Sequence, residues 1–149
     1  MKKPLLFLAI LFVFPALSHA AYNDEIAVDK ARVWQAAILA LEPYGIARQD
    51  AEKGVLESKW IEDFVQKPIK FLPEGIKRGF YRRYRLTVKL KEESGKTLVE
   101  IKGKFQQKPT GQPPSVPWHS IRPKTEDYEA EKLFFGRLMA QLNRIVTSS

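Results

Sequence analysis

The sequence predicts an α+β domain of two layers, in which a four-stranded antiparallel meander sheet is packed by an N-terminal and a C-terminal helix. Apolar side chains recur at helical spacing behind Asp29 and again over residues 126–146, whereas residues 83–105 alternate apolar and polar side chains with the period of a strand. This alternation leaves the sheet one apolar face, which two amphipathic helices can cover.

The first twenty residues have the pattern of a secretory signal peptide. Lys2 and Lys3 precede an apolar run over residues 5–17. The small residues Ser18 and Ala20 then flank His19, as at a signal-peptidase cleavage site. The run is shorter than the about 20 apolar residues that span a bilayer. The chain contains no cysteine, which excludes both a lipid-bearing cysteine and a disulfide. We therefore expect cleavage after Ala20, a periplasmic location, and one domain over residues 21–149.

The first helix of the domain is expected to begin after Asp29, whose carboxylate suits the N-cap position. Pro43 and Gly45 then end it. The apolar stripe at i, i+3, i+4 and i+7 consists of Trp34, Ala37, Ile38 and Leu41.

Two short extended segments are predicted next, over residues 46–51 and 55–61, joined by a tight turn that contains Gly54. In the second segment Trp60 shares the apolar phase of Leu56, so we expect the Trp60 side chain in the core. Residues 64–79 contain two prolines and two glycines, which predicts an irregular excursion.

A long hairpin follows, built from two strands joined by a turn at residues 92–96. The inward side chains are predicted to be Tyr84, Leu86, Val88 and Leu90, continued by Val99, Ile101 and Phe105. The outward side chains are predicted to be Arg83, Arg85, Thr87 and Lys89, continued by Glu100, Lys102 and Lys104.

The last part of the chain is expected to be a loop and a helix. Residues 108–124 contain five prolines, which predicts a loop. A terminal helix is predicted over residues 126–146, with an apolar stripe of Ala130, Phe134, Leu138, Leu142 and Ile145.

Basic and aromatic residues are concentrated in residues 75–85, GIKRGFYRRYR, a composition that is typical of nucleic-acid grooves. An exported protein, however, meets phospholipid headgroups, cell-wall polymers and acidic proteins, so nucleic acid is not the expected partner. Loss of Lys2 and Lys3 lowers the number of basic residues from 25 to 23, against 17 acidic residues, so the net charge of the mature chain is about +6. We expect an envelope protein or an anionic envelope surface to dock on a basic ribbon of Arg83, Arg85, Lys89, Lys102 and Lys104, with the loop aromatics Phe71, Phe80 and Tyr81. The alternative is an ordinary solvated strand face.

Catalytic and metal-binding patterns are not found in the sequence. After residue 20 the chain has one histidine, His119, and no cysteine, so neither a metal site nor a cofactor is expected. Ser120 adjoins His119 in the proline-rich loop, without the nucleophile-elbow pattern of a hydrolase. The adjacent carboxylates are expected at a strand end for Glu62 and Asp63, in a hairpin turn for Glu92 and Glu93, and at a helix N-terminus for Glu126 and Asp127. We therefore expect a protein that is not an enzyme.

Three runs of sequence carry a resemblance to a known family: GVLESKW at residues 54–60, RYRL at residues 83–86 and TLVEI at residues 97–101. With the tryptophan-containing first helix and the terminal helix, they resemble the helix-grip domains of the C component of the outer-membrane β-barrel assembly machinery (BamC, also called NlpB). That family consists of lipoproteins with two such domains, whereas this chain is expected to hold one domain without a lipid. The resemblance implies a helix-grip-like fold and a periplasmic, non-enzymatic accessory of outer-membrane protein assembly.

Two functions remain open at this point. The first is a binding or adaptor module of the envelope that docks through the basic ribbon. The second is a carrier of a lipid or small ligand, which needs a groove between helix and sheet lined by Trp34, Phe134 and Leu138.

Overall fold

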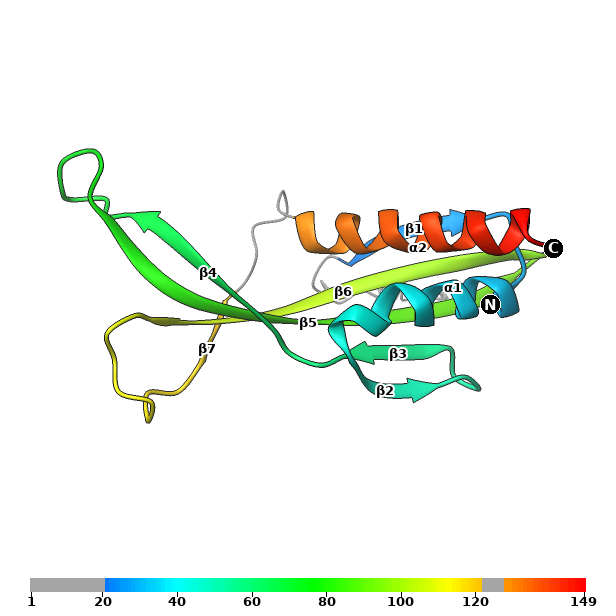
Figure 1. Cartoon of the computed structure of the whole chain (residues 1–149), viewed down its shortest axis with the longest axis horizontal. Coiled ribbons are helices and arrows are strands. Elements are labelled where there is room, and N and C mark those ends of the chain that lie inside the picture. The colour runs from blue at the N-terminus through cyan, green and yellow to red at the C-terminus, as the bar shows by residue number, and fades with distance from the viewer. Residues whose placement is uncertain (1–20, 122–127) are drawn as a thin grey trace, which may run out of the picture.

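A computed structural model describes residues 21–121 and 128–149 (Figure 1). The expected signal peptide and the expected helix start at Glu126 lie outside these residues. The helices are α1 (Lys30–Leu41) and α2 (Glu129–Thr147), with a short 3₁₀ turn, η1 (Glu42–Tyr44), after α1. The strands are β1 (Tyr22–Ile26), β2 (Ile46–Asp50), β3 (Val55–Ser58), β4 (Ile61–Pro68), β5 (Lys77–Glu93), β6 (Lys96–Pro109) and β7 (His119–Ile121).

The domain is α+β, with one antiparallel sheet and two helices, as the sequence predicts. The four expected strands are β2, β3, β5 and β6, and they are neighbours in the sheet order β1-β6-β5-β3-β2. The expected number of four is nevertheless wrong, because the described residues form a seven-stranded sheet. β4 pairs with β5, and β1 and β7 both pair with β6. β5 and β6 are 17 and 14 residues long, so each offers backbone edges to more than one partner.

The expected irregular excursion over residues 64–79 is mostly a β-hairpin. β4 pairs with β5 from Ile61 opposite Tyr84 to Pro68 opposite Lys77, so only residues 69–76 form the tip between them. Pro68 is tolerated because it is the last residue of β4, at the end of the ladder. We call residues 61–84 the arm. Figure 1 shows the arm projecting from the end of the sheet, away from both helices.

The core lies between the helices and one face of the sheet. The alternation in the long hairpin is confirmed, since Leu86, Val88 and Ile101 are completely or almost completely buried. In α2 the expected stripe is also confirmed, with Phe134, Leu138 and Leu142 buried. Asp29 caps α1 by accepting a hydrogen bond from the Arg32 backbone N–H at 3.1 Å. The buried side of α1 consists of Val33, Ala36, Ala37, Ala40 and Leu41.

The expected stripe of α1 is displaced around the helix, because Trp34 and Ile38 are only partly buried at the margin of the core. The small side chains of Ala36, Ala37 and Ala40 face the sheet and α2 instead. Alanine lets a helix backbone approach its neighbours closely, whereas a tryptophan at the centre of that face would hold the layers apart.

Trp60 does not belong to the core, contrary to the expectation. The strand is interrupted at Lys59 and Trp60, where the Lys59 backbone N–H donates to the Gly45 carbonyl at 2.9 Å. The inward position before the interruption belongs to Ser58, whose hydroxyl accepts a hydrogen bond from the Leu86 N–H at 2.9 Å. The interruption ends the alternation that begins at Leu56, so Trp60 lies on the opposite face of the sheet.

Candidate functional site

The outer face of the sheet, which is the face turned away from the helices, carries all five residues of the expected basic ribbon. The β5–β6 register sets Arg83 opposite Gln106, Arg85 opposite Lys104, and Lys89 opposite Glu100. Lys102 lies opposite Thr87. Their side chains share this face because residues two apart on a strand point the same way.

Three of the five cations are held by polar neighbours. Arg83 donates to the Gln106 side chain at 2.8 Å, and Arg85 forms an ion pair with Glu57 at 2.8 Å. Lys89 lies 3.6 Å from Glu100. Lys102 and Lys104 are exposed, and within residues 21–121 and 128–149 no carboxylate lies at ion-pair distance from either. These two lysines are therefore the cations of the ribbon that are most available to a partner.

Arg83 is also held between two tryptophan rings. Its guanidinium carbon lies 4.4 Å from the centre of the Trp60 ring and 4.4 Å from the centre of the Trp118 ring. Arg85 adds a second cation 4.7 Å from Trp60, and Lys108 lies 4.9 Å from Trp118. We call Trp60, Arg83, Arg85, Trp118 and Lys108 the Trp–Arg stack. Cation–π attraction and the planar shape of guanidinium favour such stacking.

Neither tryptophan was expected at this site. Alternation assigned Trp60 to the core, and Trp118 lies just before β7, in the segment predicted to be a loop. The available signal was the paired occurrence of tryptophan and arginine in segments that the sheet can bring together. That signal predicts a contact between tryptophan and arginine only when it is known that β4 pairs with β5 and β7 pairs with β6.

Beside the Trp–Arg stack lies a hollow of about 300 Å³, lined by Glu62, Asp63, Tyr81, Lys108 and Trp118. Asp63 accepts two hydrogen bonds from Arg82, at 2.9 and 2.5 Å, and the hydrogen bond raises the pKa of the Arg82 guanidinium. Tyr81 is half-exposed and meets Phe64 edge to face, with 6.0 Å between ring centres. The hollow thus combines aromatic surface with one lysine and two carboxylates, of which Asp63 is paired with Arg82.

The expected aromatic cluster of Phe71, Phe80 and Tyr81 is not a single loop. Phe80 and Tyr81 are consecutive residues of β5, so their side chains point to opposite faces of the arm. Tyr81 extends the outer face, whereas Phe80 is contacted by Lys67 and Arg78 at 5.5 and 5.6 Å from its ring centre. Phe71 lies in the tip. The expected grouping fails because the segment is a hairpin with two distinct faces.

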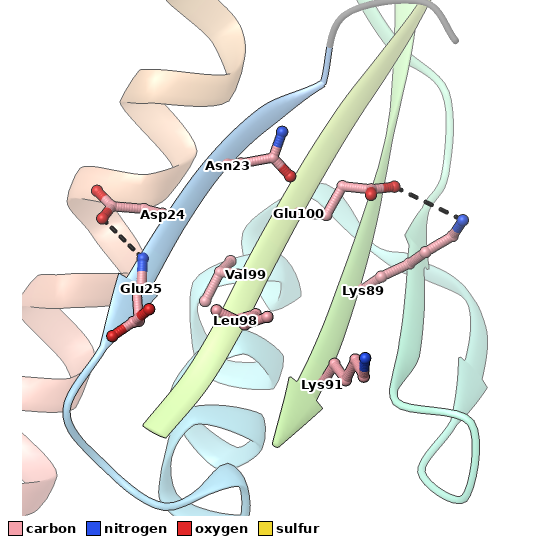
Figure 2. A pocket seen from close by; sticks show the side chains of 8 residues that line it. All are labelled: Asn23, Asp24, Glu25, Lys89, Lys91, Leu98, Val99 and Glu100. Carbon is pink, nitrogen blue, oxygen red and sulfur yellow. Dashed lines mark hydrogen bonds and ion pairs between the residues drawn. The ribbon is translucent and has the colours of Figure 1, made fainter. Parts of the chain in front are cut away.

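A second hollow, of about 460 Å³, lies on the outer face where β1, β6 and β5 run side by side (Figure 2). Figure 2 shows Lys89 reaching toward Glu100 at one side of this hollow. Lys89 thus belongs to this hollow as well as to the ribbon. The residues that line this second hollow are Asn23, Asp24, Glu25, Lys89, Lys91, Leu98, Val99 and Glu100.

The residues expected to line a ligand groove occupy other places. Phe134 and Leu138 are completely buried in the core cluster, and Trp34 lines a hollow of about 350 Å³ with Ala51 and Glu92. Among residues 21–121 and 128–149, no three side chains form a group suited to a metal ion. Neither helix of the described chain is both long and apolar enough to cross a bilayer.

Comparison with known proteins gives remote likenesses. No protein-family model matches the chain, and no curated protein matches it. A solved DUF4468 family protein from Bacteroides ovatus is 11% identical, with 84% of this chain and 81% of that chain covered and a TM-score of 0.45. Ara h 8.0201 is 11% identical, with 87% and 99% covered and a TM-score of 0.35. TTHA0849 from Thermus thermophilus is 13% identical, with 87% and 98% covered and a TM-score of 0.32. Likenesses at this level assign the chain to no family.

Proposed function

We propose that the protein is a non-enzymatic binding module of the cell envelope, which docks an acidic protein on the outer face of its sheet. The observation that carries the proposal is the Trp–Arg stack with exposed lysines beside it. Arg83 is held between two rings, and Lys102 and Lys104 project from the neighbouring strand. An arginine that is already ordered loses less conformational entropy when a partner binds.

The spacing of the lysines suits an extended acidic segment. Lys102 and Lys104 are two residues apart on β6, which separates their Cα atoms by about 7 Å along the strand. Carboxylates two residues apart on an extended partner have the same repeat. Tyr81 and Trp118 lie at the hollow beside the stack and supply aromatic surface, which is enriched in interface centres.

The location and family role are part of the same proposal. We place the module in the periplasm, on the basis of the signal-peptide pattern in residues 1–20. The resemblance to the C component of the barrel-assembly machinery supports a role as an accessory of outer-membrane protein assembly. Packing of α1 and α2 over one face of an antiparallel sheet supports a helix-grip-like description of the fold.

The test is a crosslinking pull-down from intact envelopes, with the wild type beside the Lys102→Glu/Lys104→Glu variant. Both lysines are exposed, so the variant is expected to fold normally and to lose the partner. A matched control is Lys53→Glu/Lys132→Glu, which changes the net charge equally at exposed positions of the β2–β3 turn and α2. Equal recovery of the partner by both variants would contradict docking at the ribbon. Recovery of barrel-assembly components by the wild type would support the family role.

A further inference from the structure

The tip of the arm, residues 69–76, exposes apolar side chains that the core does not use. Phe71 is 95% exposed, and Leu72 and Ile76 are about half-exposed. The turn is closed by its own backbone, since the Ile69 N–H donates to the Ile76 carbonyl at 3.2 Å and the Leu72 N–H donates to the Ile69 carbonyl at 3.2 Å. Exposed apolar side chains on an ordered turn mark an interaction site rather than unused core.

Basic residues surround this apolar turn. Residues 67–78 contain four cations, Lys67, Lys70, Lys77 and Arg78, and one acid, Glu74. The β4–β5 register sets Lys67 directly opposite Arg78, one pair behind the Pro68–Lys77 pair that borders the tip. Both of these cations also flank Phe80. Lys67, Lys77 and Arg78 therefore form a basic collar behind the apolar turn, whereas Lys70 and Glu74 lie within the tip.

The position of the tip allows it to approach a flat surface. Figure 1 shows the tip at the far end of the arm, well away from α1 and α2. A protruding turn with exposed apolar side chains can enter a lipid layer, as apolar side chains do at the boundary of headgroups and acyl chains.

We propose that the tip inserts into an anionic phospholipid bilayer, with Phe71 and Leu72 among the outer acyl carbons and the basic collar at the headgroup phosphates. The order of apolar and basic groups along the arm matches the order of acyl chains and phosphates in the bilayer. Lysine and arginine close to an anionic leaflet add electrostatic attraction to apolar insertion. The tip is distinct from the Trp–Arg stack, so the inference does not rest on the docking function.

Vesicle sedimentation tests the inference. The signal-peptide pattern predicts a mature chain that begins at Ala21, so the protein is prepared to begin at that residue. This start also removes the apolar run of residues 5–17 as a source of lipid binding. Vesicles of phosphatidylcholine with roughly 30 mol % phosphatidylglycerol, which gives them an anionic surface, are compared with vesicles of pure phosphatidylcholine. We expect clear binding to the anionic vesicles and weak binding to the neutral ones.

Phe71→Ser/Leu72→Ser is the decisive variant. It is expected to weaken binding to the anionic vesicles by about tenfold or more, because a buried phenylalanine contributes at least that factor. The matched control is Leu133→Ser/Val146→Ser, which removes two exposed apolar side chains from α2. Circular dichroism confirms that each variant is folded. Undiminished binding of the Phe71→Ser/Leu72→Ser variant, or no binding of the wild type to either vesicle, would overturn the inference.

A fluorescent label reports insertion directly. The chain contains no cysteine, so Glu74→Cys provides a unique attachment point for a polarity-sensitive dye in the tip. Glu52→Cys, in the β2–β3 turn, removes the same charge and serves as the control. We expect a blue shift with anionic vesicles for the label at residue 74 and none for the label at residue 52. Equal responses would show general adsorption and contradict insertion of the tip. Loss of vesicle binding by the Phe71→Ser/Leu72→Ser variant, with retained capture of the protein partner, would support the tip as a lipid site that is separate from the docking surface.

Discussion

Glu131 of α2 accepts a hydrogen bond from the backbone N–H of Gly103 in β6, with 3.1 Å between Oε1 and the nitrogen. Pairing of β6 with β1 ends at Ile101, and pairing with β7 begins at Phe105, so at Gly103 no strand of the described residues lies beside this edge of β6. A buried backbone N–H without a partner is costly. The carboxylate of Glu131 therefore substitutes for a neighbouring strand.

The ionisation of Glu131 should make stability depend on pH. Its side chain is 3% exposed, and burial raises its pKa above the ordinary value of 4.5. The folded state then holds the proton more tightly than the unfolded state, so the free energy of unfolding falls as the pH rises from about 4.5 through the raised pKa. Glu131→Gln keeps an oxygen that can accept from Gly103 without carrying a charge.

We expect Glu131→Gln to equal the wild type in stability near pH 4 and to exceed it above the raised pKa. Urea unfolding of both proteins across this pH range measures the difference between their free energies of unfolding. Because the other groups titrate alike in both proteins, their contributions cancel in this difference. A difference that stays constant with pH would contradict ionisation of Glu131 as its cause.

Gly103→Ala should destabilise the protein by about 1–3 kcal/mol, because it overpacks the contact between α2 and β6. A Cβ atom at residue 103 would lie 2.6 Å from Glu131 Oε1 and would also collide with the Phe105 ring. Gly136→Ala, on the exposed side of α2, meets nothing within 4 Å and should stabilise by about 0.5–1 kcal/mol. Thermal and urea unfolding compare the two changes. Equal effects would refute the close approach at Gly103.

Phe134→Ala should cost about 3–5 kcal/mol, because it leaves a cavity between α2 and the sheet. Phe134 is completely buried, whereas the adjacent Leu133 is 56% exposed, so Leu133→Ala should change stability by less than about 0.5 kcal/mol. Urea unfolding measures both. A small loss for Phe134→Ala would indicate a loosely filled interior, as a ligand carrier requires.

Trp118→Ala should clearly lower the crosslinking yield of the docked partner, whereas it should lower the thermal stability only slightly. It removes one of the two rings that hold Arg83, and an exposed cation–π contact contributes about 0.5–1 kcal/mol. Trp118→Phe keeps an aromatic face and should retain most of the partner. Crosslinking yield and thermal unfolding are measured on both variants. Equal capture by the wild type and by Trp118→Ala would exclude the Trp–Arg stack from the interface.

The sequence predicts the candidate site in part. The outward placement of Arg83, Arg85 and Lys104 follows from period-two alternation within β5 and β6, which each continue without interruption. The local pattern says nothing, however, about which side chains will meet across strands. The ion pair of Arg85 with Glu57 joins residues 28 positions apart. Because Arg85 is paired in this way, Lys102 and Lys104 are more available to a partner than Arg85 is.

The arm shows why proline and glycine counts misled the prediction. Pro68 and Pro73 indicate irregular backbone, but Pro68 ends β4 and Pro73 lies in the tip. The strand between Ile61 and Pro68 is stabilised by pairing with β5, a contact that residues 61–68 alone do not specify.

The sequence by itself determined the faces of continuous elements: the buried side of β5 and β6, the stripe of α2 and the N-cap at Asp29. These follow from local periodicity and backbone hydrogen bonding. The tertiary structure alone decided the side on which Trp60 lies, the extension of the sheet into the arm, and the pairing of Glu131 with Gly103. Each of these depends on an interruption or an edge of the sheet, where periodicity stops and contacts between distant residues determine the direction of a side chain.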